Sequence, residues 1–418
     1  MSAAMSAQPI SKDERIEALD VMRGIALLGI FIMNMPGFSS SFFGSEEAAR
    51  ERFDSFSGID SAVFMLNDAL LNGKFNGLFT LLFGMGIALQ LQRLSAVGGS
   101  SVVLRRLAVL FGFGLLHTCL LWGGDVLHIY AVLGVVLWLV RAWQPGRLLG
   151  LALALLLAQF AHGVLMASFW TLEGFEAEQR FLSGLMDLDN AVFGAGTWWQ
   201  GVALRTQETW WFYANEYLWP PSLWFWLALL TTAVLGLWVQ RSGWLRPGTL
   251  PAEWIASVAG LKALATLFFL ALGLWAGSNY LSSDHDTSQA PTPDVMLGWM
   301  LSDTHRVLMV LCYAGLILRW CQLPRAQALR RHLSRVGRMP LTMYLMQSLM
   351  GTFIFHGWGL GQWEQADVWG PAALTGLAVL LFIGVQVPLA HWWLSRHALG
   401  PAEALWRRLS YGAPLRSG

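Results

Sequence analysis

Long apolar runs separated by short charged connections constrain this chain more than any other feature of its sequence. Ten runs are long enough to cross a bilayer core of about 30 Å as helices. They lie near residues 18–36, 75–92, 103–121, 126–142, 147–169, 222–240, 254–279, 296–319, 340–357 and 370–393. A backbone inside lipid must satisfy its own hydrogen bonds, and a helix does so within one segment. The sequence therefore predicts an all-α fold, a polytopic membrane helix bundle of about ten transmembrane helices.

Composition agrees with a lipid environment and excludes other classes of protein. Of the 418 residues, 55% are hydrophobic and 13% are charged, which is about half the charged share of a soluble protein. The net charge of +1, without a basic stripe, predicts no nucleic-acid partner. The three cysteines are spaced neither for a disulfide framework nor for zinc, so no metal is expected. The lipid bilayer is the expected surroundings of the chain.

The charges in the connections predict the orientation of the helices. Arginines gather in every second connection, at Arg93, Arg105, Arg106, Arg141, Arg147, Arg241, Arg246, Arg319, Arg325, Arg330, Arg331, Arg335 and Arg338. Acidic residues gather in the others, at Glu173, Glu176, Glu178, Asp187, Asp189, Asp284, Asp286, Glu364 and Asp367. Because basic connections stay on the cytoplasmic side, we expect the N-terminus and the C-terminus to lie in the cytoplasm.

The spans and connections divide the chain into three regions. Residues 1–170 are expected to form an N-terminal five-helix membrane region, and residues 222–418 a C-terminal one. Residues 171–221 form an outer-side amphipathic and aromatic connection, whose tryptophans are typical of the membrane interface, with a sugar-stacking platform as the alternative. Residues 59–72 are too short and polar for an ordinary span and predict an interfacial or re-entrant helix. Closely spaced glycines predict tight helix packing at Gly84, Gly86, Gly112 and Gly114.

Polar residues at membrane depth are the candidates for function, because burying them is costly without partners. In the first span, Arg23 and Asn34 are eleven residues apart, or about 16 Å along a helix. One helix can thus present a cytoplasmic-side cation and an outer-side amide. The alternative is that Arg23 forms a local ion pair with Asp20, which fixes the position of the helix end.

The hairpin of the third and fourth spans carries a second group. His117 lies near the outer end of one helix, Asp125 in the turn, and His128 and Tyr130 at the start of the next. Asp125 and His128 share a face at i and i+3, so the carboxylate can orient an imidazole that acts as a general base. A buried polar clamp that holds the hairpin closed is the competing interpretation.

The eighth predicted span contains Asp303, His305 and Arg306 inside the membrane. Asp303 and Arg306 are at i and i+3, where the two charges can neutralise each other. Such a pair is more often structural than functional, and a role in binding is the alternative.

Several motifs resemble the YeiB-like family of bacterial inner-membrane proteins. They include RIEALDVMRG at 15–24 and GRMPLTMYLMQS at 337–348, and the most specific is the C-terminal signature, GPAE at 400–403 and WRRLSYG at 406–412. Residues 79–86 and 117–130 are also similar, so the resemblance covers nearly the whole chain. It implies a multi-pass protein of the bacterial inner membrane and an envelope role.

The N-terminal motif resembles, more distantly, the transmembrane acyltransferase superfamily, which includes polysaccharide O-acyltransferases and heparan glucosaminide N-acetyltransferase. The resemblance implies an acyl-CoA donor on the cytoplasmic side and a sugar acceptor on the far side. Arg23 matches the motif arginine, and Asn34 falls where the polysaccharide enzymes have a catalytic histidine. An amide cannot act as a base, so His117 or His128 would have to supply that function.

The leading hypothesis is therefore a membrane-embedded acyltransferase that moves an acyl group from acyl-CoA to an envelope glycan or a small hydroxyl or amine acceptor. Arg105, Arg106 and Arg338 are the candidates for contacting coenzyme A phosphates. A transporter or flippase that uses the same Asp, His and Arg residues is the main alternative, and a non-catalytic scaffold is the third. The sequence leaves the oligomeric state open, a homodimer included.

Overall fold

The structure is a computed structural model, and it describes residues 17–411 except 42, 44–45, 57, 96–99, 217–222, 246–248, 284, 286–288, 324–325 and 366–367. Among these residues every regular element is a helix, which confirms the predicted all-α bundle. Several charged positions used in the orientation argument lie outside the described residues, namely Arg246, Asp284, Asp286, Arg325 and Asp367.

Ten helical elements coincide with the ten predicted spans. They are α1 (Glu17–Ser39), α4 (Lys74–Ser95), α5 (Ser100–Leu120), α6 (Leu127–Leu139), α7 (Pro145–Ala167), α10 (Leu223–Arg241), α12 (Val258–Ser282), α13 (Pro293–Gln322), α15 (Pro340–Phe355) and the run α16–η4–α17 (Pro371–Leu394). In the described part of the chain, eight helical segments are long and apolar enough to cross a membrane. The other two, α6 and α15, have 13 and 16 residues and are well buried among their neighbours.

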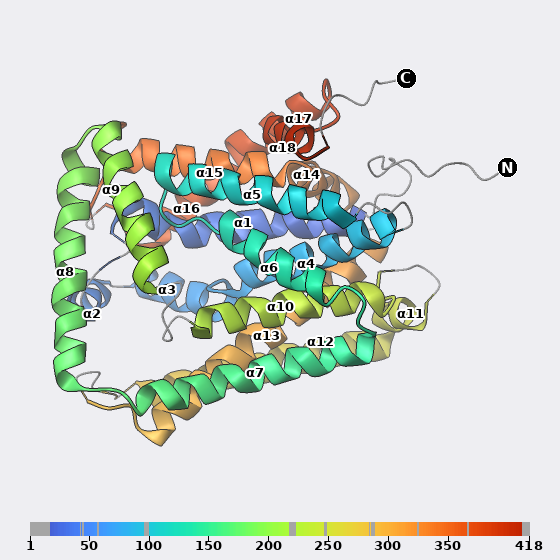
Figure 1. The fold of residues 1–418 in the computed structure, drawn as a ribbon, viewed down its shortest axis with the longest axis horizontal. Coiled ribbons are helices and arrows are strands. Elements are labelled where there is room, and N and C mark those ends of the chain that lie inside the picture. Colours follow the sequence, from blue (N-terminus) through green and yellow to red (C-terminus); the bar gives the residue numbers. More distant parts are fainter. Residues whose placement is uncertain are drawn as a thin grey trace.

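The remaining helices lie toward the two ends of the bundle. They are α2 (Glu46–Ser55), α3 (Ile59–Leu70), α8 (Leu172–Ala195), α9 (Trp198–Trp211), η2 (Phe212–Glu216), α11 (Leu250–Ala256), α14 (Gln327–Gly337) and α18 (Pro401–Tyr411). Figure 1 shows α8 lying across one end, nearly perpendicular to the long helices, and α14 and α18 near the other end. The separate helix α3 occupies the stretch for which an interfacial or re-entrant helix was predicted.

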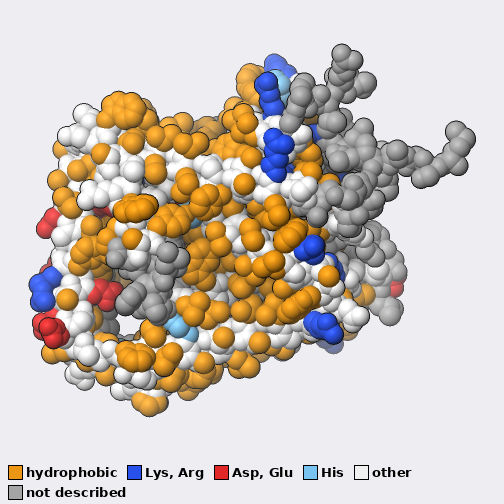
Figure 2. Space-filling view, in the orientation of Figure 1, with side chains coloured by type: hydrophobic (Ala, Val, Ile, Leu, Met, Phe, Trp, Pro, Cys, Tyr) orange, Lys and Arg blue, Asp and Glu red, His pale blue; other side chains and the backbone are white. Residues whose placement is uncertain are grey.

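Charge is segregated along the bundle. Most basic side chains visible in Figure 2 lie toward the end that carries α14 and α18, and most acidic ones lie at the end covered by α8. We call the first the basic end, after Arg330, Arg331 and Arg335 of α14 and the arginines of α18, and the second the acidic end, after the carboxylates of α8. α1 begins at the basic end and α18 lies there too.

Glycines allow two pairs of helices to cross with their backbones in contact. A Cβ on Gly84 of α4 would lie 2.1 Å from the Ala233 carbonyl oxygen, and one on Gly236 of α10 would lie 2.1 Å from that of Leu81. Gly114 is similarly tight against the backbone of His128, whereas Gly86 and Gly112 face open space. The prediction of tight packing was therefore right for Gly84 and Gly114 and wrong for Gly86 and Gly112.

Helices from both predicted membrane regions interleave in one bundle. α10 packs against α4 and α7, while α1 packs against α14, α15 and α16. A single hydrophobic core runs through these contacts and includes Phe31 and Phe38 of α1, Leu81 of α4 and Phe355 of α15. The first span thus packs against four helices of the C-terminal region, α13 to α16, as well as against α4.

The C-terminal helix α18 caps the start of α15. One carboxylate oxygen of Glu403, Oε1, accepts from the backbone N–H groups of Leu341 and Thr342 at 2.7 and 3.1 Å. Oε2 accepts from the Thr342 hydroxyl at 2.6 Å. The first N–H groups of a helix have no partner within it, and Glu403 supplies one for α15. This contact explains the acidic residue of the C-terminal signature.

We expect Glu403→Ala to destabilise the protein by about 1–3 kcal/mol, because two buried N–H groups and a hydroxyl lose their acceptor. The loss should appear as a lower unfolding temperature of the purified protein in detergent. Glu403→Gln, which keeps one carbonyl acceptor, should fall between wild type and Glu403→Ala. Equal unfolding temperatures for all three proteins would contradict the capping role.

Candidate functional site

A cavity of about 590 Å³ lies at the acidic end, between the bundle and the helices α8 and α9 that cover it. Asn34 of α1, Asp125 and His128 line it, and Tyr344 of α15 contributes to its floor. Three of these four residues were singled out in the sequence as candidates. The structure therefore brings the amide of the first span together with Asp125 and His128 of the hairpin at one cavity.

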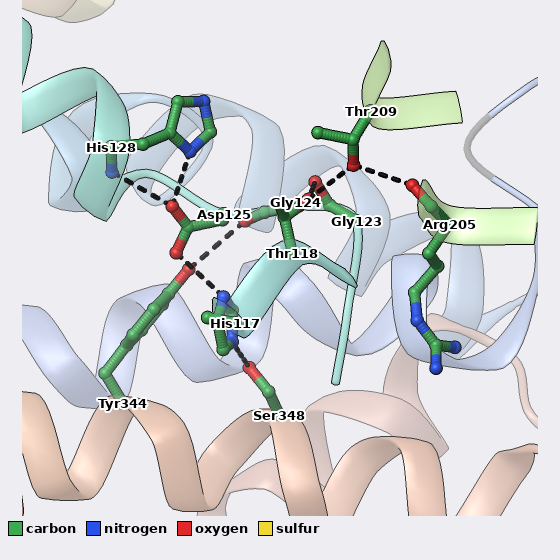
Figure 3. A network of polar contacts seen from close by, with 10 residues as sticks. All are labelled: His117, Thr118, Gly123, Gly124, Asp125, His128, Arg205, Thr209, Tyr344 and Ser348. Carbon is green, nitrogen blue, oxygen red and sulfur yellow. Dashed lines mark hydrogen bonds and ion pairs between the residues drawn. The ribbon is translucent and has the colours of Figure 1, made fainter. Parts of the chain in front are cut away.

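Asp125 joins both histidines of the hairpin (Figure 3). His117 Nδ1 lies 2.7 Å from one carboxylate oxygen, and His128 Nδ1 lies 2.6 Å from the other. The second oxygen also accepts from the backbone N–H of His128 at 3.0 Å. Gly114 makes this approach possible, because a Cβ there would lie 2.7 Å from Asp125 Oδ2. The expected convergence of the three side chains is observed.

The two histidines differ in what their second ring nitrogens can reach. His117 Nε2 lies 2.8 Å from the hydroxyl of Ser348 on α15, and His117 does not line the cavity. With Nδ1 donating to Asp125, Nε2 of His117 accepts from Ser348, so both nitrogens are used in joining α5 to α15. His128 lines the cavity, and its Nδ1–H bond to Asp125 makes Nε2 the basic nitrogen. The sequence could not choose between these histidines, but their surroundings do.

A smaller cavity of about 210 Å³ lies toward the basic end. Arg23 and Arg106 line it together with the phenyl rings of Phe79 and Phe83. Tyr130 also lines it, stacked on both phenyl rings, and its hydroxyl lies 3.1 Å from that of Thr80. The wall of this small cavity is mostly apolar, and the side chains of Arg23 and Arg106 form one part of it.

The candidate arginines occupy different environments. Arg23 forms an ion pair with Asp20 at 2.7 Å and still lines the small cavity. The guanidinium of Arg106 stacks over Trp406 of α18 at 4.3 Å and donates to the Tyr411 hydroxyl at 3.2 Å. Arg105 is exposed and Arg338 is half-buried, and neither lines the small cavity. Arg23 and Arg106 are therefore the cations placed to meet a ligand there.

The two cavities meet at a shared wall. Ile30 of α1, Val126 before α6, and Tyr344 of α15 line both of them. The Tyr344 hydroxyl donates to the Gly124 carbonyl at 3.2 Å, and the His117 ring lies against the Tyr344 ring at 5.0 Å. The hairpin group therefore stands directly beside the boundary between the basic-end and acidic-end cavities.

The polar residues of α13 lie apart from this site. Asp303 and Arg306 line a separate cavity of about 450 Å³ beside α7, where Asp303 lies 3.5 Å from Arg306 and accepts from Trp224 at 2.9 Å. His305 is within hydrogen-bonding distance of the Ala271 carbonyl, at 2.8 Å, and lines none of these cavities. These three residues therefore lie outside the cavity that Asp125 and His128 line.

Sequence reasoning missed four buried polar residues on the far wall of the acidic-end cavity. They are Asp189 of α8, Arg205 and Glu208 of α9, and His356 at the end of α15, and we call them the Arg205 cluster. Arg205 and Glu208 stand at i and i+3 in a tryptophan-rich helix. That spacing was the signal in the sequence that could have identified them. A capping box formed by Thr197 and Gln200 indicates the start of helix α9.

Neither cavity has the ligands of a metal site. Within the described residues, no group of three or more His, Cys, Asp or Glu side chains could hold a metal ion. The acidic-end site instead combines an oriented imidazole, an amide and a set of buried carboxyl groups. These are components of proton transfer and of hydrogen-bonded recognition.

Comparisons with known proteins agree with the motifs. Residues 239–413 match the family described as "Protein of unknown function (DUF418)". The chain is 29% identical to the uncharacterized protein YxaH of Bacillus subtilis, over 97% of this chain and 96% of that protein. It is 26% identical to the uncharacterized protein YeiB of Escherichia coli, over 96% and 97%. No solved structure matches.

Substituting His117 should test its structural role. We expect His117→Ala to lower the unfolding temperature more than His128→Ala, because His117 bridges Asp125 on the hairpin and Ser348 on α15. Removing one partner of a buried polar pair typically costs about 1–3 kcal/mol. Ser348→Ala should reproduce part of the loss. A larger loss of stability in His128→Ala than in His117→Ala would reverse this assignment.

Proposed function

Given a chain that resembles YeiB and carries the DUF418 domain in its C-terminal half, we propose that it is a membrane-embedded acyltransferase. Acyl-CoA is the donor, and a hydroxyl or amine group of an envelope glycan or small molecule is the acceptor. The supporting observation is the pair of cavities that meet at Ile30, Val126 and Tyr344. One offers cations and apolar walls, and the other offers an oriented histidine.

The basic-end cavity suits the donor. Arg23 and Arg106 can contact phosphate groups of coenzyme A, since guanidinium groups pair with phosphate oxygens through two hydrogen bonds. The remaining wall is apolar and includes Leu27, Phe79 and Phe83, which suits a slender pantetheine arm or an acyl chain. The basic end would face the cytoplasm, because basic connections stay on that side. In a bacterium, the inner membrane is the location that we propose for the protein.

The acidic-end cavity suits the acceptor and the chemical step. His128 Nε2 takes the proton from the acceptor hydroxyl or amine while that oxygen or nitrogen attacks the thioester carbonyl. The carbon–sulfur bond breaks, and the coenzyme A sulfur leaves with the proton that His128 returns. Asp125 holds the imidazole by its Nδ1–H and stabilises the imidazolium that forms. The Asn34 amide in the same cavity supplies an N–H for the oxyanion of the tetrahedral intermediate.

This assignment gives His128 a measurable role. His128→Ala should reduce acyl transfer by about 10² to 10⁴-fold, the usual effect of losing a general base, while leaving binding of a coenzyme A analogue intact. His117→Ala should lower activity only in proportion to the folded fraction. The measurements are release of coenzyme A thiol and the unfolding temperature of each variant. Full transfer activity in folded His128→Ala would contradict the mechanism.

The role of the basic-end cavity in donor binding can be tested at Gly86, which lines this cavity and faces open space. Gly86→Leu should leave the fold intact but fill much of the cavity, so binding of a long-chain acyl-CoA analogue should fall at least tenfold. Gly112→Leu is the matched control, because Gly112 also faces open space but lines no cavity described here. Unchanged analogue binding in folded Gly86→Leu would favour the transporter alternative.

A further inference from the structure

The Arg205 cluster forms the wall of the acidic-end cavity that is contributed by α8, α9 and the end of α15. Asp189, Arg205 and His356 are each 2% exposed, and Glu208 is 9% exposed. Helix α9 is fixed to the rest of the protein through Arg205, whose Nε and Nη2 donate to the carbonyl groups of Cys119 and Leu120 at 3.1 and 3.2 Å. The cluster is therefore held rigidly against the hairpin that carries Asp125.

Several polar atoms of this cluster have no hydrogen-bond partner within the described part of the chain. They are Arg205 Nη1 and both ring nitrogens of His356. Buried polar atoms are normally paired, because leaving them without a partner is costly. So many such atoms around one cavity indicate a surface that a polar ligand completes.

Burial favours the protonated forms of the two acids in the cluster. Burial and the neighbouring Asp189 carboxylate raise the pKa of Glu208 well above its usual value. Burial also raises the pKa of Asp189, and the Ser41 hydroxyl donates to this carboxyl group. The cluster therefore combines the N–H donors of Arg205 with carboxyl groups that can donate as well as accept.

Aromatic rings stand beside these polar atoms. The His356 ring lies 4.8 Å from Phe193 and 5.2 Å from Trp363, and the two hydrophobic rings are 5.6 Å apart. Trp363 is itself fixed by donating to Asn190 Oδ1 at 3.0 Å. Phe193 and Trp363 both line the cavity. An apolar surface next to mixed donors and acceptors matches a ligand with one apolar face and a polar edge.

We propose that the Arg205 cluster binds a neutral polyhydroxylated ring. Its hydroxyl groups donate to Asp189 and Glu208 and accept from Arg205, while one face of the ring lies against Phe193 and Trp363. An ammonium group would meet the Arg205 cation, and an anion would meet the Asp189 carboxylate. Placing this ring as the acyl acceptor rests on the proposed function, but its binding does not require an acyl donor.

Calorimetric titration of the full chain in detergent, without acyl-CoA, tests the proposal. The neutral probes are glucose and N-acetylglucosamine, and the charged probes are glucosamine and glucuronate. At least one neutral probe should bind at least tenfold tighter than either charged one. Asp189→Asn should weaken that binding at least tenfold. Asp187→Asn, the same substitution at an exposed position of α8, should leave it unchanged.

Three outcomes would overturn the inference. The first is that neither neutral probe binds, and the second is that a charged probe binds as tightly as the neutral ones. The third is an unchanged affinity in folded Asp189→Asn. If that variant does not fold, the comparison of probes on the wild-type chain still decides. Neutral sugar binding without any acyl transfer would remove only the proposed function. Acyl transfer to another acceptor, without sugar binding, would remove only this inference.

Discussion

The buried carboxylate of Asp125 is the interaction on which the centre of this protein depends. A carboxylate away from water must be paired, and Asp125 is paired on both sides by histidines from the two arms of one hairpin. His117 extends the contact to Ser348 on α15, and Tyr344 of the same helix bonds to the hairpin turn. One anion thus fixes the position of α5, α6 and α15 and, with them, the wall between the two cavities.

The architecture was predictable because it follows from local rules. Apolar length and the alternation of arginine-rich and acidic connections located all ten helical elements, including α6, whose 13 residues are too few to identify a span by length. The convergence of His117, Asp125 and His128 was predictable for the same reason, since a tight turn leaves few arrangements for residues so close in sequence. Asp20 and Arg23 also pair as i and i+3 spacing suggests.

Long-range contacts were the part that the sequence could not supply. Nothing local shows that Ser348 would bond to His117, or that His128 would line the acidic-end cavity. Nor does anything local show that Arg106, and not Arg105, would line the basic-end cavity. The Arg205 cluster was missed because its four members come from three elements and meet only after α8 and α9 fold across the acidic end. Asp303, His305 and Arg306 were plausible by type, but α13 places Asp303 and Arg306 in the cavity beside α7 and His305 against α12.

Helix α18 shows how the order of synthesis bears on this site. It is translated after the ten apolar segments, yet Glu403 caps α15 and Trp406 holds Arg106 beside the basic-end cavity. Insertion of the ten apolar segments can therefore be finished while the basic-end cavity is still incomplete. The nascent protein would pass through a fully inserted but unassembled state, in which α18 meets α5 and α15 only after translation of the C-terminal signature.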